Sequence, residues 1–295
     1  MSDESVQKVL RYYKRLESKW GYQFITWKTK HFGYYPGGKA NISEKEAQRN
    51  TQDQVAKNLK LNGGERVLDA GCGYGTTACY LVKKYHVKVV GIDINTYEIK
   101  YARKLAKKEN IDDKVKFGVQ DYSHTNFPNK SFDRVFTLET LSHSPNVKKT
   151  LREFYRVLKP GGKIALFEYT LAPDSKFSRE DMEKLDRGIA GTAALGLKEF
   201  RHDMFPKILT GIGFKNVREE NITKQFHPSL IRLKNIAVIP YFFINHLKLQ
   251  KYFVNTSLAV EWDNLVNKGL IRYCIFTATI KPQKTKRVAQ VESMD

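Results

Sequence analysis

A glycine-rich turn after a short apolar run constrains the fold of this chain more than any other feature. Residues 67–75 (VLDAGCGYG) predict a buried strand that ends at Asp69 and turns sharply into a helix beginning near Thr76. Glycines allow such a turn to adopt dihedral angles that other residues avoid, and they let a ligand lie against bare backbone. A second apolar run, residues 87–92, ends in Asp93. An acid that closes the second strand of a βαβ unit can accept hydrogen bonds from a ribose.

The spacing of the glycines separates the candidate nucleotide cofactors. Dinucleotide-binding loops usually read G-x-G-x-x-G, because a pyrophosphate must sit over the helix N-terminus. This chain instead reads G-x-G-x-G from Gly71 to Gly75, with Asp69 before it. An acid there would repel a pyrophosphate, but it suits a ligand that carries an ammonium group and no phosphate, such as S-adenosylmethionine. The alternative is an ordinary tight strand-to-helix connection, and the acids Asp69 and Asp93 together favour the cofactor site.

In this turn and in three later segments, the chain resembles the class I S-adenosylmethionine-dependent methyltransferases. Residues 116–122 are similar to the third strand of the family, residues 131–139 to the fourth, and residues 156–168 to the helix end, turn and fifth strand. Asp121 stands where an acid of this family commonly contacts the adenine amino group. The resemblance implies a cofactor site made by these residues: Asp69, Gly71, Cys72, Gly73, Asp93, Ile94, Asn95, Gln120, Asp121, Tyr122 and Glu139.

Strands and helices alternate from residue 66 to residue 167, which is typical of a parallel sheet with helices on both faces. Two helices, residues 5–20 and 43–60, are expected before the first strand, and Ser43 with Glu46 forms a capping box. Residues 213–218 and 270–278 resemble strands six and seven of the family, which are a close hairpin in its minimal form. The resemblance therefore implies an α/β, Rossmann-like fold. It has a seven-stranded, mostly parallel sheet, an N-terminal helical cap and a helical insertion between strands six and seven.

These elements predict a division of the chain into four parts. The parts are an N-terminal cap (1–60), a cofactor-binding core (61–222 and 268–282), a helical insertion or lid (223–267) and a polar tail expected to be disordered (283–295). The insertion contains the apolar run 236–244, flanked by Arg232, Lys234, His246, Lys248 and Lys251. It is either an apolar lid over a lipophilic substrate that touches a membrane surface, or two ordinary helices that complete the core.

Two local segments narrow the resemblance. Residues 139–145 (ETLSHSP) resemble the Glu-Ala-Thr-Cys-His-Ala-Pro segment of sterol C-methyltransferases, and residues 167–169 (FEY) resemble their Tyr-Glu-Trp segment. The N-terminal part, including residues 31–35 (HFGYY), is also similar to tocopherol C-methyltransferases. One position departs from the pattern, since sterol enzymes usually carry Asn where this chain has Asp93. An Asp there is normal for the wider family.

Four side chains are predicted to reach the rim where ligands of such sheets bind. Glu139 and His143 follow the fourth strand, and Glu168 and Tyr169 end the fifth. If the acceptor is an alkene, methylation creates a carbocation, which aromatic faces and a carboxylate stabilise before a base removes a proton. Glu139 could instead only fix its loop or touch the methionine part of the cofactor. His143 could simply cap the following helix.

Aromatic residues of the N-terminal part could form a wall of the acceptor pocket. They are Tyr12, Tyr13, Trp20, Tyr22, Trp27 and Tyr34. The alternative is an aromatic cluster that packs the N-terminal helices onto the core.

Composition limits the compartment and the partners. Cys72, Cys79 and Cys274 form no CxxC pair and no zinc-ligand spacing, so neither a disulfide framework nor a metal site is expected. We expect neither a secretion signal nor a spanning segment, and therefore a cytoplasmic protein that is either free or peripheral on an acidic membrane surface. The net charge of +20 favours anionic partners, but no RNA-binding module accompanies it. Nucleic acid is therefore not expected, and the oligomeric state stays open.

The sequence therefore favours an S-adenosylmethionine-dependent C-methyltransferase of a small lipophilic acceptor, with sterols and other isoprenoids leading. An N- or O-methyltransferase of a small metabolite is the main alternative. Two further alternatives are an RNA methyltransferase, which only the charge suggests, and a catalytically inert cofactor-binding protein.

Overall fold

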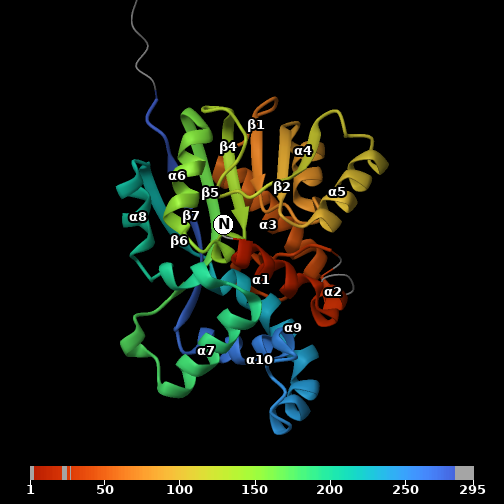
Figure 1. The fold of residues 1–295 in the computed structure, drawn as a ribbon, viewed down its shortest axis with the longest axis vertical. Helices are drawn as coiled ribbons and strands as arrows, with labels where there is room; N and C mark the ends of the chain where they lie inside the picture. The colour runs from red at the N-terminus through yellow and green to blue at the C-terminus, as the bar shows by residue number, and fades with distance from the viewer. Residues whose placement is uncertain (1–2, 22–24, 27, 283–295) are drawn as a thin grey trace, which may run out of the picture.

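The structure is a computed structural model that describes residues 3–21, 25, 26 and 28–282 (Figure 1). The tail predicted to be disordered, residues 283–295, lies outside the described residues. Within the described ranges, no helix is long and apolar enough to cross a bilayer.

A mixed sheet organises the described part of the chain. Its strand order is β3-β2-β1-β4-β5-β7-β6, in which β7 runs antiparallel to β5 and β6 while the other neighbours are parallel. The strands are β1 (Arg66–Ala70), β2 (Lys88–Asp93), β3 (Val115–Val119), β4 (Phe132–Leu138), β5 (Leu158–Leu171), β6 (Lys215–Asn221) and β7 (Ile271–Thr279). The predicted seven-stranded, mostly parallel α/β fold is confirmed.

Helices cover both faces of this sheet. The helices are α1 (Asp3–Lys14), α2 (Leu16–Trp20), α3 (Glu44–Leu59), α4 (Thr76–Tyr85), α5 (Thr96–Lys108), α6 (Val147–Val157), α7 (Arg179–Thr192), α8 (Phe205–Ile212), α9 (Thr223–His246) and α10 (Val254–Asn267). Apolar residues of α3, α4 and α5 share one buried cluster, and those of α6 and α8 share another. Along β5, Ala165 and Phe167 join the first cluster while Ile164 and Leu166 join the second, because strand side chains alternate between faces.

Five helices gather at the edge of the sheet where the parallel strands end. Figure 1 shows α1, α2, α7, α9 and α10 together below the strands. The chain passes through α9 and α10 between β6 and β7, as the predicted insertion requires. The boundaries proposed for cap, core and insertion stay a prediction.

The predicted helix over residues 5–20 is interrupted in the structure. Arg15 has an extended backbone, with φ −59° and ψ 142°, so α2 starts in a new direction after α1. This break brings Glu17 to the N-terminus of α10, where its carboxylate accepts hydrogen bonds from the amides of Asn255 (3.1 Å) and Thr256 (2.7 Å). A carboxylate stabilises the unpaired N–H groups at a helix start. Through Glu17, the N-terminal helices are therefore hydrogen-bonded to α10.

A buried hydrogen-bond junction also ties the N-terminal segment to α9. The Ser229 hydroxyl accepts from the Gly33 amide at 2.8 Å and donates to Glu44 Oε1 at 2.8 Å. The other oxygen of Glu44 accepts from the Tyr35 hydroxyl at 2.9 Å. A Cβ at Gly33 would lie 2.5 Å from Ala47 Cβ, so only glycine allows this close approach to α3.

Replacing Ser229 by alanine is expected to destabilise the protein, because the Gly33 N–H and one Glu44 oxygen lose their buried partner. We expect the free energy of unfolding to fall by about 1–3 kcal/mol, measured by urea denaturation followed by circular dichroism. Thr210→Ala is the control, since it removes an exposed hydrogen bond within α8 and should change stability by less than about 0.5 kcal/mol. Equal losses in both variants would contradict the role of the junction.

Candidate active site

The glycine-rich loop after β1 is held against the end of β2. Gly71, Gly73 and Gly75 have φ of 92°, 51° and 74°, a region that favours glycine. The carboxylate of Asp93 accepts hydrogen bonds from the amides of Gly73 (3.0 Å) and Asn95 (2.9 Å). Asp93, predicted as a ribose contact, therefore also fixes the loop.

Asp69 supplies an unpaired buried carboxylate beside this loop. The residue is 3% exposed, and within the described residues its Oδ2 has no hydrogen-bond partner. Burial, with a smaller effect of the nearby Asp93, raises the pKa of Asp69 well above its usual range. The ionised form of a carboxyl group buried in this way is stable only beside a counter-ion. The ammonium group of S-adenosylmethionine is such a counter-ion, so the buried Asp69 carboxylate fits this cofactor.

A small cavity of about 70 Å³ lies over the loop and brings many of the predicted cofactor residues together. Those that line it are Asp69, Gly71, Cys72, Gly73, Asp93, Ile94, Tyr122 and Glu139. Its volume is far below the ~300–1,000 Å³ of common ligand sites. Tyr13 and Lys30, from the N-terminal segment, also line it, and the Lys30 ammonium lies 3.8 Å from the centre of the Tyr13 ring.

Three other predicted cofactor residues lie outside this cavity and hydrogen-bond to nearby backbone. Asn95 Oδ1 caps α5 by accepting from the Tyr97 amide at 3.1 Å. Asp121 Oδ1 accepts from the Ser123 amide at 2.8 Å, and Gln120 Oε1 accepts from the Asn126 amide at 3.0 Å. Their contacts with a cofactor stay predictions.

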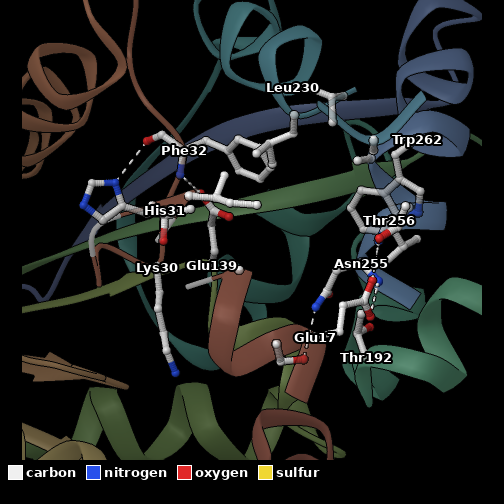
Figure 2. Close-up of a pocket in the computed structure, with 18 of the residues that line it drawn as sticks. Glu17, Lys30, His31, Phe32, Glu139, Thr192, Leu230, Asn255, Thr256 and Trp262 are labelled. Atoms are coloured by element: carbon white, nitrogen blue, oxygen red, sulfur yellow. Dashed lines mark hydrogen bonds between the residues drawn. The ribbon is translucent and has the colours of Figure 1, made fainter. Parts of the chain in front are cut away.

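A second, larger cavity of about 520 Å³ adjoins the first. Its walls come from α1 and α2, the 25–32 segment, the end of β5, the chain after α7, and α9 and α10. Figure 2 shows Glu17 beside Asn255 and Thr256 on one side of it and Glu139 beside Phe32 on the other. Leu230, Leu233, Ala237 and other apolar side chains make up much of the lining. This volume is suited to a small lipophilic molecule.

Glu139 lies at the boundary of the two cavities and lines both. Its Oε1 accepts from the Phe32 amide (2.8 Å) and the Tyr273 hydroxyl (2.9 Å), and its Oε2 accepts from the Tyr169 hydroxyl (2.7 Å). Its own φ of 53° is uncommon for a residue with a side chain and is often found at functional sites. Burial raises the pKa of Glu139 to about 7, although the three donors act in the opposite direction.

His143 also lines both cavities, where it is held as a neutral imidazole. Its Nδ1 lies 3.3 Å from the Ala193 carbonyl, which can only accept, so we assign the ring proton to Nδ1. Its Nε2 then accepts from the Tyr13 hydroxyl at 3.2 Å. Burial lowers the pKa of His143 to about 4, so the ring carries no charge at neutral pH.

The other two predicted catalytic residues differ in position. Tyr169 lines the larger cavity, and its ring contacts that of Trp262 at a centroid distance of 5.1 Å. Glu168 lies outside both cavities, and its Oε1 accepts from the backbone amides of Thr140 (3.0 Å) and Leu141 (2.6 Å). Burial raises the pKa of Glu168 to about 8. Through these two bonds Glu168 supports the turn after Glu139, and its predicted catalytic role stays a prediction.

The aromatic wall predicted from the N-terminal part is found in part. Tyr12 and Tyr13 line the larger cavity, whereas Tyr34 packs against the core. Tyr22, Trp27 and the side chain of Trp20 lie outside the described residues.

Several contacts of the site cannot be predicted from the sequence. Phe32 donates through its backbone, Tyr273 reaches Glu139 from β7, and Trp262 comes from α10. The helix α7, which leads into the cavity wall at Thr192, was not predicted either. Its start at Ser178, whose hydroxyl accepts from the Asp181 amide at 3.1 Å, is a capping signal that would have identified it.

Comparison with known proteins identifies the family. Residues 68–166 match the family model described as a methyltransferase domain. The chain is 33% identical to methyltransferase GfsG from Streptomyces halstedii over 84% of its own length and 86% of that protein. The chain belongs to the S-adenosylmethionine-dependent methyltransferase family. Its cofactor is therefore S-adenosylmethionine, as the residues around the glycine-rich loop indicate.

The relatives of this methyltransferase differ in their chemistry. It is 32% identical to the S-adenosyl-L-methionine-dependent Diels-Alderase iccD of Talaromyces variabilis, over 86% of this chain and 89% of that protein. It is 30% identical to the sterol 24-C-methyltransferase of Debaryomyces hansenii, over 68% of this chain and 50% of the relative. The geranyl diphosphate C-methyltransferase of Streptomyces coelicolor, at 14% identity, has the same fold with a TM-score of 0.71, over 94% of this chain and 98% of that one.

Metal ligation is not evident in the described part of the methyltransferase. No group of three or more His, Cys, Asp or Glu side chains in those residues is arranged to hold a metal ion.

The Asp69→Asn variant is expected to bind S-adenosylmethionine about 5- to 150-fold more weakly, because the ammonium group loses a buried carboxylate worth about 1–3 kcal/mol. Isothermal titration calorimetry measures this loss. 5′-Methylthioadenosine, which lacks the amino-acid part, is the control ligand and should bind both proteins equally. Asp93→Ala removes the partner of the Gly73 amide in the loop, so it should weaken the binding of both ligands. An equal loss of both ligands in Asp69→Asn would contradict the ammonium contact.

Proposed function

We propose that this methyltransferase transfers a methyl group to a carbon atom of a small lipophilic acceptor, a sterol or another isoprenoid. The observation that carries the proposal is the Glu139 carboxylate, fixed by three donors between the two cavities. A methyl group that passes from the cofactor to an acceptor must cross this boundary.

The proposed chemistry assigns Glu139 two tasks. When bound, S-adenosylmethionine supplies an electrophilic methyl group. Addition of that methyl group to an alkene carbon leaves a positive charge on the acceptor, and the product forms when a proton is lost. A carboxylate stabilises such a charge, and a base with a pKa near the working pH removes the proton most efficiently. The pKa of Glu139, raised to about 7 by burial, suits this second task better than that of His143, lowered to about 4.

The aromatic side chains around Glu139 support the same proposal. Tyr169, Trp262 and Phe32 border the larger cavity, and the face of an aromatic ring attracts a nearby cation. We propose that they surround the acceptor while its charge develops. Because Glu168 supports the turn from outside the cavity, we now propose it as a positioning residue.

The charges in the larger cavity favour a neutral or cationic acceptor. Its described lining contains the acids Glu17, Glu44 and Glu139 but only two basic side chains, Lys30 and Arg232. Lys30 is itself paired with Glu98. A diphosphate would require a basic cluster there. We therefore do not propose geranyl diphosphate as the acceptor of this chain. An isoprenoid without a diphosphate group stays within the proposal.

Two other functions have a specific observation in their favour. An amine that becomes N-methylated would also be attracted by the Glu139 carboxylate and the aromatic faces. A cofactor-dependent cycloaddition is the second, because the relative with 32% identity over most of both chains is a Diels-Alderase. An RNA acceptor has no such support, because the larger cavity is mostly apolar.

An assay with isotopically labelled methyl groups separates these functions. The protein is incubated with labelled cofactor and with sterols, linear isoprenoids, quinones or tocopherol precursors, amines and RNA in turn, and products are identified by mass spectrometry. We expect label on carbon of an isoprenoid or sterol. Label on nitrogen would replace the proposal with the amine alternative. Cofactor-dependent conversion of a polyene without label would replace it with cycloaddition.

Methyl transfer is expected to increase with pH through a midpoint near 7, because the ionised form of Glu139 is the active one. Glu139→Gln should lower kcat by about 100-fold or more and abolish this increase. Tyr169→Phe removes a donor that lowers the pKa of Glu139, so it should move the midpoint to higher pH. Steady-state kinetics between pH 5 and pH 9 test this. A midpoint that stays in place in Glu139→Gln would exclude Glu139 as the titrating group.

A further inference from the structure

The helix α9 has two different apolar faces. Ala237 and Ile244 face the interior and are buried, and Ile236 and Pro240, which line the larger cavity with Ala237, are also partly exposed to solvent. Toward the exterior lie four large apolar side chains, three in its C-terminal half and one directly after its last residue, with exposed fractions of 60–71%. These are Ile239, Phe242, Phe243 and Leu247, which we call the α9 outer face. One helix thus separates the acceptor site from an exposed apolar surface.

The α9 outer face is a continuous patch. Ile239, Phe242 and Phe243 follow the i, i+3, i+4 spacing of one helical face, and the two phenylalanine rings contact each other at a centroid distance of 5.5 Å. Tyr252 and Phe253, in the turn after α9, are exposed as well. In Figure 1, the C-terminal part of α9 lies at the end of the molecule farthest from the strands. Clustered apolar exposure of this kind marks an interaction surface.

Lysines supply the charge that directly follows the α9 outer face, whereas the acids Glu261 and Asp263, which contact α9, are paired with Arg187 and Lys234. Residues 222–260 contain no Asp or Glu, but they contain Lys224, Arg232, Lys234, Lys248 and Lys251. Lys248 and Lys251 are exposed and follow directly after the patch. Aromatic and aliphatic side chains next to lysines are typical of helices that lie in the interface of an anionic bilayer.

A second copy of the chain suits this surface less well. A symmetric dimer places the same patch on both subunits, so the lysines would face each other without an acid in the segment to pair with them. An anionic phospholipid surface pairs with the lysines and also accepts the apolar side chains.

From these observations we infer that the α9 outer face docks the protein on an anionic phospholipid bilayer. The inference rests on the proposed function, because a lipophilic acceptor stored in that bilayer would then enter the larger cavity past Ile236 and Pro240. The helix lies on the membrane, and the depth of insertion is that of interfacial helices, about 5–10 Å.

Vesicle flotation tests the docking without any acceptor. The full chain is mixed with vesicles of phosphatidylcholine alone or of phosphatidylcholine with phosphatidylserine. We expect binding to the anionic vesicles and at least about tenfold weaker binding to the neutral ones, because each lysine near the surface contributes a factor of about five. The double variant Phe242→Ser/Phe243→Ser should bind the anionic vesicles at least about tenfold more weakly.

Three controls make the outcome decisive. Tyr97→Ser removes an exposed aromatic residue from α5, away from α9, and should bind like the unchanged protein. Lys248→Glu/Lys251→Glu should lose the preference for anionic vesicles. Light scattering after size exclusion measures the mass in solution. Equal flotation of all variants would overturn the inference, and so would a dimer that dissociates in Phe242→Ser/Phe243→Ser.

The activity assay separates this inference from the proposed function. With the acceptor in detergent micelles, Phe242→Ser/Phe243→Ser should turn over at the unchanged rate. With the acceptor in anionic vesicles, it should be at least about tenfold slower. Methylation in micelles together with absent vesicle binding would overturn only the docking. Vesicle binding without methylation of any lipophilic acceptor would overturn only the proposed function.

Discussion

The hydrogen bonds to the Glu139 carboxylate are the interaction on which the site depends. Their donors, Phe32, Tyr169 and Tyr273, come from the N-terminal segment, from β5 and from β7. A buried carboxylate is costly unless donors surround it, so all three parts of the chain must be in place for Glu139 to be accommodated. Formation of the site is therefore coupled to docking of the N-terminal segment on the sheet.

The charges around the site are arranged by sign. Asp69 and Asp93 lie at the glycine-rich loop, where the cofactor brings positive charge, and Glu139 lies where the acceptor would become positive. The histidines nearby, His31 and His143, both have a pKa lowered to about 4 by burial, so they add no competing cation. Lys30 and Arg232 are the exceptions; Lys30 is paired with Glu98, and Arg232 donates a hydrogen bond to the Ile25 carbonyl.

The sheet and the cofactor loop were readable from the sequence because both are local patterns. Strand residues alternate toward two packed faces, and the glycines of the loop are required by φ values between 51° and 92°. The direction of the Glu168 side chain was not readable. Its place at the end of β5 predicts a rim residue, but its carboxylate turns inward to the amides of Thr140 and Leu141. The position of a residue at the end of a strand predicts that it lies at the edge of the sheet, but it does not predict the direction of its side chain.

The acceptor cavity was the least predictable part because its walls come from segments far apart in the chain. Tyr12, Thr192, Leu230 and Trp262 each come from a different helix, and none belongs to a motif. Their meeting depends on tertiary contacts such as the Glu17 cap of α10 and the Ser229 junction. Relatives that share the cofactor loop can therefore differ in acceptor through small changes in these helices. The resemblance of one chain to both a cycloaddition enzyme and a sterol methyltransferase fits this arrangement, because the walls of the acceptor cavity are built from other segments than the cofactor loop.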